Sequence, residues 1–451
     1  MTATEIRGLL VIGLGTALVP LDASVNVAFP QIAAHFALDI PSIRFVVISY
    51  VLIFASLTLG FGRIGDLVGY RVVFLVGCLV STCAFTLCTF APSFGWFLAG
   101  RAMQGTGAAL ILSVGPALAT GLLGDQRRAE ALGWYSMMMA LGGVIGPVLA
   151  GALLDRFGWS SVFAFRIPVA GAALLLGFTL PQRTRPNSAA RFDAAGGVLL
   201  AVTIGALILT LDHLRGLPAG IWAVLGAATL TVLALLAFIW RQRMATSPII
   251  RLGVLREGDV ARINIANILG NLATFSGPLL IPFYLVQFGG VSVQVGGLLL
   301  AFSPIGSVLA TPVAGRLASR MSSRILAQIG IFTVATTLVA ILWAANGHAI
   351  VWMVAAMFVH GIGAGLFSVA VLDILTASLP PADRGVAGSL GMVTRTIGTL
   401  SGASVLMLVF QAGGPTDTEG GFLAGFQHGF AAAAASALLA GLVLHRRSRK
   451  G

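Results

Sequence analysis

The 451-residue sequence has little charge: only 9% of its residues are Asp, Glu, Lys or Arg. About a quarter of a typical soluble domain is charged, because a folded surface must still face water. The shortage of charge therefore excludes a soluble globular protein. Hydrophobic residues make up 57% of the chain instead, which indicates that lipid is the solvent for most of it.

Residue types that build metal centres and disulfides are also scarce. The three cysteines, Cys78, Cys83 and Cys88, lie five apart in one apolar run. That spacing places them on different faces of a helix and fits no metal-ligand pattern, so we interpret them as apolar packing residues. The six histidines form no cluster, and no His-Glu-x-x-His motif occurs. These absences disfavour a membrane enzyme that works by metal or acid–base chemistry.

Fourteen apolar runs are long enough to cross a bilayer, for which a helix needs about 20 mostly apolar residues. The expected spans are 7–29, 43–62, 72–91, 95–118, 130–152, 160–180, 196–212, 219–240, 263–286, 295–316, 325–345, 349–372, 387–410 and 423–444. The sequence thus predicts an all-α integral membrane protein with 14 transmembrane helices.

The distribution of basic residues predicts the orientation of these spans. An even number of spans places both termini on one side, and 21 of the 27 basic residues fall on that side, against three on the other and three within spans. Basic residues concentrate in the cytoplasm, so we expect a multi-pass protein of the inner (plasma) membrane with both termini cytoplasmic. The same asymmetry accounts for the net charge of +12 without nucleic acid, and the basic C-terminal tail is expected to touch anionic lipid.

A charged motif interrupts the apolar pattern once clearly and once faintly. GRIGDLVGYR occupies residues 62–71, between two spans, and GRLASRMSSR occupies residues 315–324 in the corresponding turn of the second half. Internal duplication is typical of transporters. We therefore predict two six-helix bundles, residues 1–185 and 259–451, with an inserted pair of spans in residues 186–258. Only the first copy has an acid, Asp66; Ser319 stands at its counterpart.

The residues of the first motif are expected to form a gate. Glycine allows a tight turn and a close approach between helices. The carboxylate of Asp66 can meet an arginine or the positive end of a neighbouring helix, in a contact that holds one conformation and breaks in the other. The expected gate residues are Gly62, Arg63, Asp66, Gly69 and Arg71. The alternative is a charged turn that only fixes topology.

Asp22 and Arg101 lie within spans, where a charge is costly and marks a functional site by default. At about 1.5 Å per residue, both fall at the same depth of a hydrocarbon core about 30 Å thick. Burial favours the neutral form of an acid and a nearby arginine favours the charged form, so this pair could tie protonation to conformation. A static pair that only orders the bundle is the alternative.

Other polar residues also lie within the spans. Asn26 lies one turn beyond Asp22 and shares its helix face. Arg166 and Arg395 either counter a buried acid or line the cavity. His360 is expected to be a packed, hydrogen-bonded histidine.

Small residues recur at helical spacing in span 130–152. Gly142, Gly146 and Ala150 predict one face against which another helix packs closely, and Pro147 adds a bend. Tyr135 and Met138 supply nearby aromatic and thioether groups, which suit varied apolar ligands or plain packing.

These motifs together resemble the major facilitator superfamily, and within it the 14-helix drug:proton antiporters. GRIGDLVGYR is similar to the loop motif G-x-L-x-D-x-x-G-[RK]-[RK], with Tyr70 in place of one basic residue. LDASVNVAFPQI (21–32) resembles the first-helix motif, and LAGRAMQGTGAA (98–109) the fourth-helix motif. The fifth-helix antiporter motif is matched by Gly133, Gly142, Gly146, Pro147 and Gly151. Arg166 stands where relatives often show Asn.

The resemblance implies a proton-coupled efflux antiporter that exports small lipophilic compounds, cationic ones included, by alternating access. It implies no catalytic residue, metal or cofactor, only the proton gradient. The expected partners are a small-molecule substrate, protons and membrane lipid, with no nucleic acid and a single chain as the working unit. Candidate substrate contacts are Asn26, Gln104, Tyr135, Met138 and Arg395. An exporter dedicated to one metabolite or antibiotic, and a non-transporting membrane sensor, are the alternatives.

Overall fold

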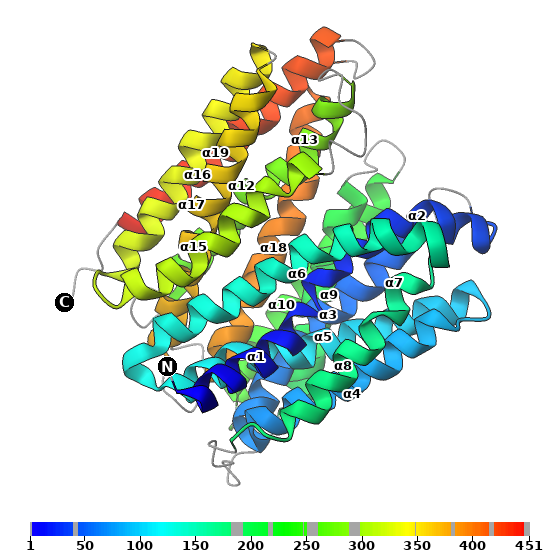
Figure 1. Cartoon of the computed structure of the whole chain (residues 1–451), viewed down its shortest axis with the longest axis vertical. Coiled ribbons are helices and arrows are strands. Elements are labelled where there is room, and N and C mark those ends of the chain that lie inside the picture. The colour runs from blue at the N-terminus through cyan, green and yellow to red at the C-terminus, as the bar shows by residue number, and fades with distance from the viewer. Residues whose placement is uncertain are drawn as a thin grey trace. The chain divides into compact units, whose positions relative to one another are not determined.

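The computed structural model describes residues 2–38, 44–181, 193–214, 220–246, 248–249, 260–287, 298–347, 349–379, 384–414 and 419–445. Within those ranges the chain is helical and has no strand (Figure 1). Backbone groups in lipid must find their hydrogen bonds inside their own segment, which is why the long apolar runs form helices.

The chain divides into two compact units. The first contains residues 1–206, 230–252 and 379–392, and the second contains residues 207–229, 253–378 and 393–451. Three helices contribute to both units: α9 (Ala194–Leu214), α10 (Ile221–Met244) and α18 (Arg384–Gln411).

The remaining helices each belong to one unit. Those of the first unit are α1 (Ala3–Ala17), η1 (Pro20–Asp22), α2 (Ala23–His35), α3 (Arg44–Val68), α4 (Tyr70–Thr89), α5 (Phe94–Leu123), η3 (Asp125–Arg127), α6 (Arg128–Phe157), α7 (Ser161–Ala164) and α8 (Arg166–Gly177). Those of the second are α12 (Val260–Thr274), α13 (Ser276–Gln287), α15 (Phe302–Ala318), α16 (Ser323–Asn346), α17 (Ile350–Ala377) and α19 (Glu419–His445).

Thirteen helical segments of the described ranges are long and apolar enough to cross a membrane. They coincide with thirteen of the predicted spans, which confirms a multi-pass all-α membrane protein. The predicted span 160–180 corresponds to a shorter apolar segment, Ser161–Gly177, which α7 and α8 share. The total of fourteen, the two six-helix repeats and the boundaries at 185 and 258 stay predictions.

The predicted first span, residues 7–29, is not one continuous helix. Pro20 has no backbone N–H to continue the α-helical ladder, and the chain passes through the single 3₁₀ turn η1 before α2 begins. A similar break separates α12 from α13 in the second unit. The interruption places Asp22 at the junction of two helical segments rather than on an unbroken helix.

The motif at residues 62–71 is mostly helical rather than a loop. α3 continues to Val68 and α4 begins at Tyr70, so Gly69 alone joins them. Its φ of +103° lies in the left-handed region, which a glycine adopts without strain. This single residue reverses the chain and keeps the side chains of both helix ends close together.

α5 is the most buried of the thirteen segments, since 83% of its apolar stretch lies inside the protein. Glycines let its backbone approach its neighbours: a Cβ at Gly105 would lie 2.5 Å from the carbonyl oxygen of Tyr50, and one at Gly107 would lie 2.3 Å from the hydroxyl of Ser81. α5 is thereby held between α3 and α4, and its polar side chains project into the core of the first unit.

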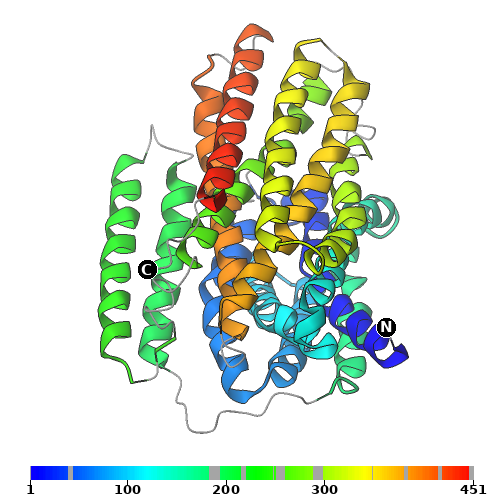
Figure 2. The ribbon, with the colours of Figure 1, turned by 90° about the vertical axis from the view of Figure 1, so that its left-hand side faces the viewer.

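The helices α9 and α10, which the sequence predicts as an inserted pair, lie side by side (Figure 2). Asp193, just before α9, accepts hydrogen bonds from the Nη2 of Arg241 at 2.9 Å and the Nε2 of Gln242 at 3.2 Å, both on α10. The same carboxylate accepts from the backbone N–H of Gly196 at 3.1 Å and so caps α9. One acid therefore joins the two helices at one end.

Candidate functional site

Asp22 is surrounded by hydrogen-bond donors in the interior of the first unit. Its carboxylate accepts from Nη1 and Nη2 of Arg101 at 2.7 and 2.9 Å, from Nε2 of Gln104 at 2.8 Å and from Nη1 of Arg166 at 3.0 Å. An ionised carboxylate only accepts hydrogen bonds, so the surroundings suit the unprotonated acid. We call these four residues the Asp22 cluster.

Arg101 is positioned by three further contacts on α5 and α3. Its Nε donates to the carbonyl oxygen of Val46 at 3.0 Å, and its Nη1 donates to the Oε1 of Gln104 at 2.6 Å. The guanidinium carbon lies 4.7 Å from the centre of the Tyr50 ring, a distance typical of a cation–π contact. The two-pronged bond to Asp22 is therefore held at a fixed angle, with Arg101 almost wholly buried.

Arg166, at the start of α8, supplies the second positive charge. Its Nη2 donates to the carbonyl oxygen of Leu21 at 2.8 Å and to the hydroxyl of Ser24. Its guanidinium carbon lies 5.5–5.7 Å from the centres of three phenylalanine rings, those of Phe85, Phe163 and Phe165. Of the two roles that the sequence left open for Arg166, the structure places it against the buried acid.

The Asp22 cluster brings together one acid and two arginines, which leaves one surplus positive charge within the unit. A buried ion pair stays favourable only when its remaining donors and acceptors are satisfied. Here the carbonyl oxygens of Leu21 and Val46 and the hydroxyl of Ser24 accept from the arginines, while the buried Nε of Arg166 has no hydrogen-bond partner in the described part of the structure. The sequence predicted the pairing of Asp22 with Arg101 and offered a buried acid as one of two roles for Arg166, but it did not identify Asp22 as that acid.

Asp66 joins three helices at the end of α3. Its Oδ1 accepts from the hydroxyl of Tyr70 at 2.7 Å, and its Oδ2 accepts from the backbone N–H of Val386 at 3.2 Å, in the first turn of α18. Both contacts lie within the first unit. Tyr70, which replaces a basic residue of the family motif, therefore supplies the donor that holds the carboxylate.

The other predicted gate residues surround this contact. Arg63 and Gly62 are buried on α3, and Gly69 forms the turn. The Nη2 of Arg71 donates to the carbonyl oxygen of Phe178, just beyond α8. Arg384, in the first turn of α18, forms an ion pair with Asp125 that the sequence did not suggest.

The predicted small face of α6 packs on the broken first span. A Cβ at Gly142 would lie 2.6 Å from the carbonyl oxygen of Ala17, and one at Gly146 would lie 2.9 Å from that of Leu21. Ala150 is fully buried on the same face. Gly133 is also buried, near the beginning of α6. Pro147 and Gly151 belong to α6, but their surroundings lie outside the described part of the structure. This close packing of α6 on the first span, which we call the seam, reaches Leu21, the residue next to Asp22.

The candidate substrate contacts are dispersed. Asn26 and Arg395 are exposed, on α2 and α18. Gln104 is buried in the Asp22 cluster. The ring of Tyr135 occupies the space where a Cβ of Gly115 would lie, and the side chain of Met138 occupies the space where a Cβ of Gly13 would lie. Both side chains therefore fill gaps in the first unit in this conformation.

Separate places in the structure hold His360, Asp373 and the three cysteines. His360 is buried on α17, with its Nδ1 3.3 Å from the hydroxyl of Ser303, as a packed histidine would be. Asp373, also on α17, accepts from the hydroxyl of Ser323 at 2.6 Å. Cys78 and Cys88 are buried and Cys83 is exposed, all as free thiols. Among the described residues no three His, Cys, Asp or Glu side chains could hold a metal ion.

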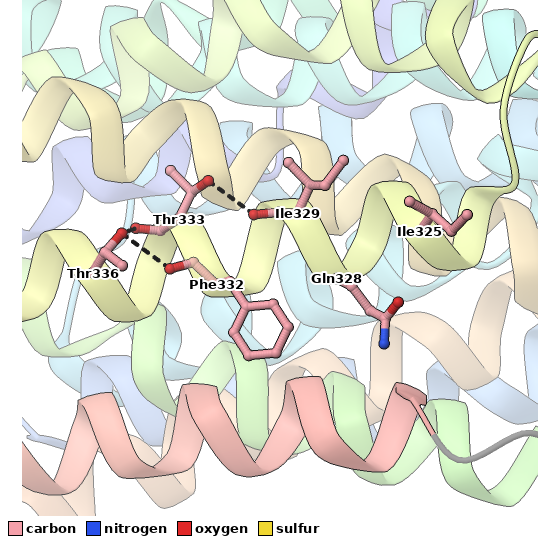
Figure 3. A pocket seen from close by; sticks show the side chains of 6 residues that line it. All are labelled: Ile325, Gln328, Ile329, Phe332, Thr333 and Thr336. Carbon is pink, nitrogen blue, oxygen red and sulfur yellow. Dashed lines mark hydrogen bonds between the residues drawn. The ribbon is translucent and has the colours of Figure 1, made fainter.

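A shallow groove of about 510 Å³ lies along α16 (Figure 3). Its lining is Ile325, Gln328, Ile329, Phe332, Thr333 and Thr336. The two threonine hydroxyls donate to backbone carbonyl oxygens of their own helix, and the isoleucines are half exposed. Exposed apolar side chains on a spanning helix suit lipid, and no predicted site residue lines the groove.

Comparisons with known proteins agree on one family. The family model described as Major Facilitator Superfamily matches residues 12–403 and, separately, 263–451. The riboflavin transporter RibZ of Clostridioides difficile (strain 630) is 26% identical over 406 residues, 89% of this chain and 87% of RibZ. The methylenomycin A resistance protein of Bacillus subtilis (strain 168) is 30% identical over 324 residues, 70% of this chain and 69% of that protein.

Two further similarities extend over most of the chain. The multidrug resistance protein Stp of Mycobacterium tuberculosis (strain CDC 1551 / Oshkosh) is 27% identical over 417 residues, 91% of this chain and 77% of Stp. The solved structure of the proton:xylose symporter XylE has a TM-score of 0.67 at 15% identity, covering 98% of this chain and 95% of XylE, a likeness of fold alone. The matched family model, with the intramembrane charges and the multi-pass architecture, shows that the chain belongs to the major facilitator superfamily of membrane transporters.

Proposed function

We propose that this protein is a proton-coupled antiporter that exports small lipophilic compounds by alternating access. The observation that carries the proposal is the Asp22 cluster, in which an acid inside a span is bound by two arginines and a glutamine. Ionisable residues within spans mark proton relays and substrate paths. The names of relatives, a multidrug resistance protein and a methylenomycin resistance protein, support export of foreign compounds.

Coupling would follow from separating the carboxylate from its arginines. With Arg101 and Arg166 bound, every neighbour of Asp22 donates, which suits the charged acid. A conformational change that moved both arginines away would leave a desolvated carboxylate without a counter-charge, and burial then favours the neutral form. Asp22 would bind a proton in one conformation and release it in the other.

The gate and the seam would make this exchange obligatory. The bonds from Tyr70 and Val386 to Asp66 would hold one conformation and break in the other. The close packing of α6 at Gly142 and Gly146 would exclude water beside Asp22, so that protons do not leak. The only energy source required is the proton gradient, and the working unit is a single chain in the plasma membrane with both termini cytoplasmic.

A second candidate is an exporter dedicated to one compound. Two relatives carry names of that kind, a riboflavin transporter and a methylenomycin resistance protein. A strain that expresses the protein, grown on a panel of toxic compounds, separates the two: resistance to many unrelated compounds favours a broad exporter, and resistance to one favours the dedicated kind. Counterflow of a compound in proteoliposomes excludes a sensor that moves nothing.

The test of proton coupling is uphill transport of a compound found in that screen. Purified protein in proteoliposomes with an imposed proton gradient should accumulate the compound, and Asp22→Asn should abolish accumulation because Asn keeps the shape of Asp without its titration. Glu419→Gln, which removes the acid at the first residue of α19, is the matched control. Accumulation at the wild-type rate by Asp22→Asn would refute the role of Asp22.

A further inference from the structure

The two arginines of the Asp22 cluster are also held by the helices around them. Arg101 donates to the carbonyl oxygen of Val46 and lies over the ring of Tyr50, both on α3. The guanidinium carbon of Arg166 lies 5.5–5.7 Å from the centres of three phenylalanine rings outside the first span, and such cation–π contacts stabilise a desolvated charge. Both guanidiniums therefore keep their places without help from Asp22, and together we call them the arginine platform.

The break in the first span is bound to this platform by side chains. Each described hydrogen bond from Arg166 goes to residues 21–24: to the carboxylate of Asp22, to the carbonyl oxygen of Leu21 at 2.8 Å and to the hydroxyl of Ser24. That hydroxyl donates in turn to the carbonyl oxygen of Leu21 at 2.7 Å. Pro20 removes a bond of the helical ladder at this point. The angle between α1 and α2 therefore depends on these side-chain bonds.

α2 is packed along one face only. Its buried side chains are Ser24, Val25, Ala28 and Ile32, which fall within one narrow strip of the helix surface. α1 buries residues over a wider part of its circumference, from Gly8 to Thr16. Segments with fewer buried contacts open at lower cost, so α2 is the half of the first span that moves more readily.

The charge of Asp22 controls how firmly the break is bound. A protonated carboxyl no longer neutralises the guanidiniums, and it becomes a donor among neighbours that donate. The other titratable groups around it are the phenol of Tyr50 on α3 and the thiol of Cys88 on α4, both buried, and neither is charged near neutral pH. α6 meets the break with Gly142 and Gly146, which carry no charge.

We infer that residues 20–24 form a hinge, that α2 is the half of the first span that moves, and that Arg166 is the positioning residue that ties this movement to the charge of Asp22. The inference deepens the proposed function, from which it takes the protonation of Asp22. Because the arginine platform is held by other helices, Asp22 leaves both guanidiniums when the hinge opens. Arg166 adds what Arg101 lacks, which is a direct bond to the backbone of the hinge at Leu21.

The test measures distances between two spin labels on the full-length protein, without substrate or gradient. One label is placed on the exposed native thiol of Cys83 on α4, and Cys78→Ala and Cys88→Ala remove the buried thiols. The second label is placed on Gln31→Cys, at an exposed position of α2, which gives the α2 distance. For the control, Leu10→Cys at an exposed position of α1 gives the α1 distance.

Asp22→Asn removes the charge as protonation does. It should shift the α2 distance by about 2 Å or more, the size of helix displacements in switching proteins, and leave the α1 distance unchanged. Arg166→Gln should shift the α2 distance in the same direction. Arg166→Lys should retain part of the wild-type distance, because the charge remains while the planar set of contacts is lost.

Ser24→Ala separates the hinge contact from the charge. It keeps both guanidiniums on Asp22 and removes one acceptor of Arg166, so the α2 distance should spread toward the value of Asp22→Asn. Ser113→Ala is the matched control. It removes another fully buried hydroxyl, which donates to the carbonyl oxygen of Leu110 on its own helix, and should leave the α2 distance unchanged. If Arg166→Gln fails to fold, Asp22→Asn and Ser24→Ala decide.

The inference is overturned if Asp22→Asn keeps the wild-type α2 distance, if the α1 distance changes equally, or if folded Arg166→Gln keeps the wild-type α2 distance. A role for Arg166 in stability alone would lower the thermal midpoint without moving α2. Failure of the inference is distinct from that of the proposed function. Uphill export with α2 fixed would sink the inference and keep the antiporter, while movement of α2 without gradient-driven export would do the reverse.

Discussion

At the scale of single residues, Arg166 adds a second guanidinium to the expected Asp22–Arg101 pair, so that the carboxylate of Asp22 is bound by two arginines. The guanidinium of Arg166 binds Asp22, Leu21 and Ser24 at once, so it also fastens the break in the first span. A lysine could keep the charge but not this planar set of contacts. Any movement that frees Asp22 must therefore also release the backbone at the junction of η1 and α2.

Asp66 offers a direct comparison between the two copies of the charged motif. Asp66→Asn should reduce the initial rate of efflux about tenfold, because bonds to an ionised acceptor are roughly twice as strong as neutral ones and two donors share this carboxylate. Ser319→Ala should have a smaller effect, since the hydroxyl of Ser319 donates only to the carbonyl oxygen of Arg316 on its own helix. Rates are compared at matched expression.

Tyr70→Phe refines that measurement by removing the hydroxyl that donates to Oδ1 of Asp66. Its rate should fall between those of the wild type and Asp66→Asn. Equal losses from Asp66→Asn and Ser319→Ala would show that the bond to α18 does not govern the gate.

At the scale of helices, both units use the same device to bring two backbones together. Gly142 and Gly146 on α6 abut the carbonyl oxygens of Ala17 and Leu21, while Gly398 and Gly402 on α18 abut those of Ile268 and Leu272. Each pair is spaced by four residues, which places both glycines on one helix face, and each faces the span that is broken near its middle. Residues that lack a side chain are required at all four positions.

A larger residue in this seam should uncouple transport. Gly146→Leu should still assemble, because overpacking costs about 1–3 kcal/mol, but it should lock one conformation or leak protons, since conformations of a transporter differ by only a few kcal/mol. Dissipation of a pH gradient across vesicles, with and without substrate, measures the effect.

A matched pair of alanines controls for the loss of glycine itself. A Cβ at Gly146 meets the Leu21 carbonyl oxygen at 2.9 Å, whereas one at Gly143 on the same helix has its first contact at 4.0 Å. Gly146→Ala should therefore disturb exchange and Gly143→Ala should not. Normal exchange without leak in Gly146→Leu would reduce the seam to ordinary packing.

The clamp between α9 and α10 should give stability a pH dependence. Burial alone would raise the pKa of Asp193, but the hydrogen bonds from Arg241, from Gln242 and from the N–H of Gly196 hold that pKa below its ordinary value. A lowered folded-state pKa stabilises the protein above the unfolded value of about 4, and that contribution is lost as pH falls through the folded value. Asp193→Asn should lower the thermal midpoint at pH 7 but converge with the wild type at low pH. A constant difference between pH 7 and pH 3 would contradict the clamp.

At the scale of the whole molecule, the two units are alike in packing and unlike in charge. The first unit contains the Asp22 cluster, and the second has a ladder of asparagines with Arg395 beside it.

The topology of the whole chain can be tested by reporter fusions. The asymmetry of basic residues predicts both termini in the cytoplasm, so a fluorescent protein at either end should fold and a periplasmic phosphatase at either end should be inactive. Fusions after Gly158 and after Pro181 should report opposite sides, because an apolar segment, Ser161–Gly177, separates them. The same side for both would leave thirteen spans and place the termini on opposite sides.

The sequence by itself determined thirteen of the spanning segments and the charges inside them, because hydrophobic length and the cost of buried charge are properties of short segments. Only the tertiary structure decided their partners. Arg166 reaches Asp22 across 144 residues, and Val386 reaches Asp66 across 320. Such pairings depend on which helix faces meet. Glycines such as Gly142 and Gly398 favour particular meetings because they let two backbones approach closely. The periodicity of one helix does not contain this information, since a small face admits any neighbour that the rest of the chain brings to it.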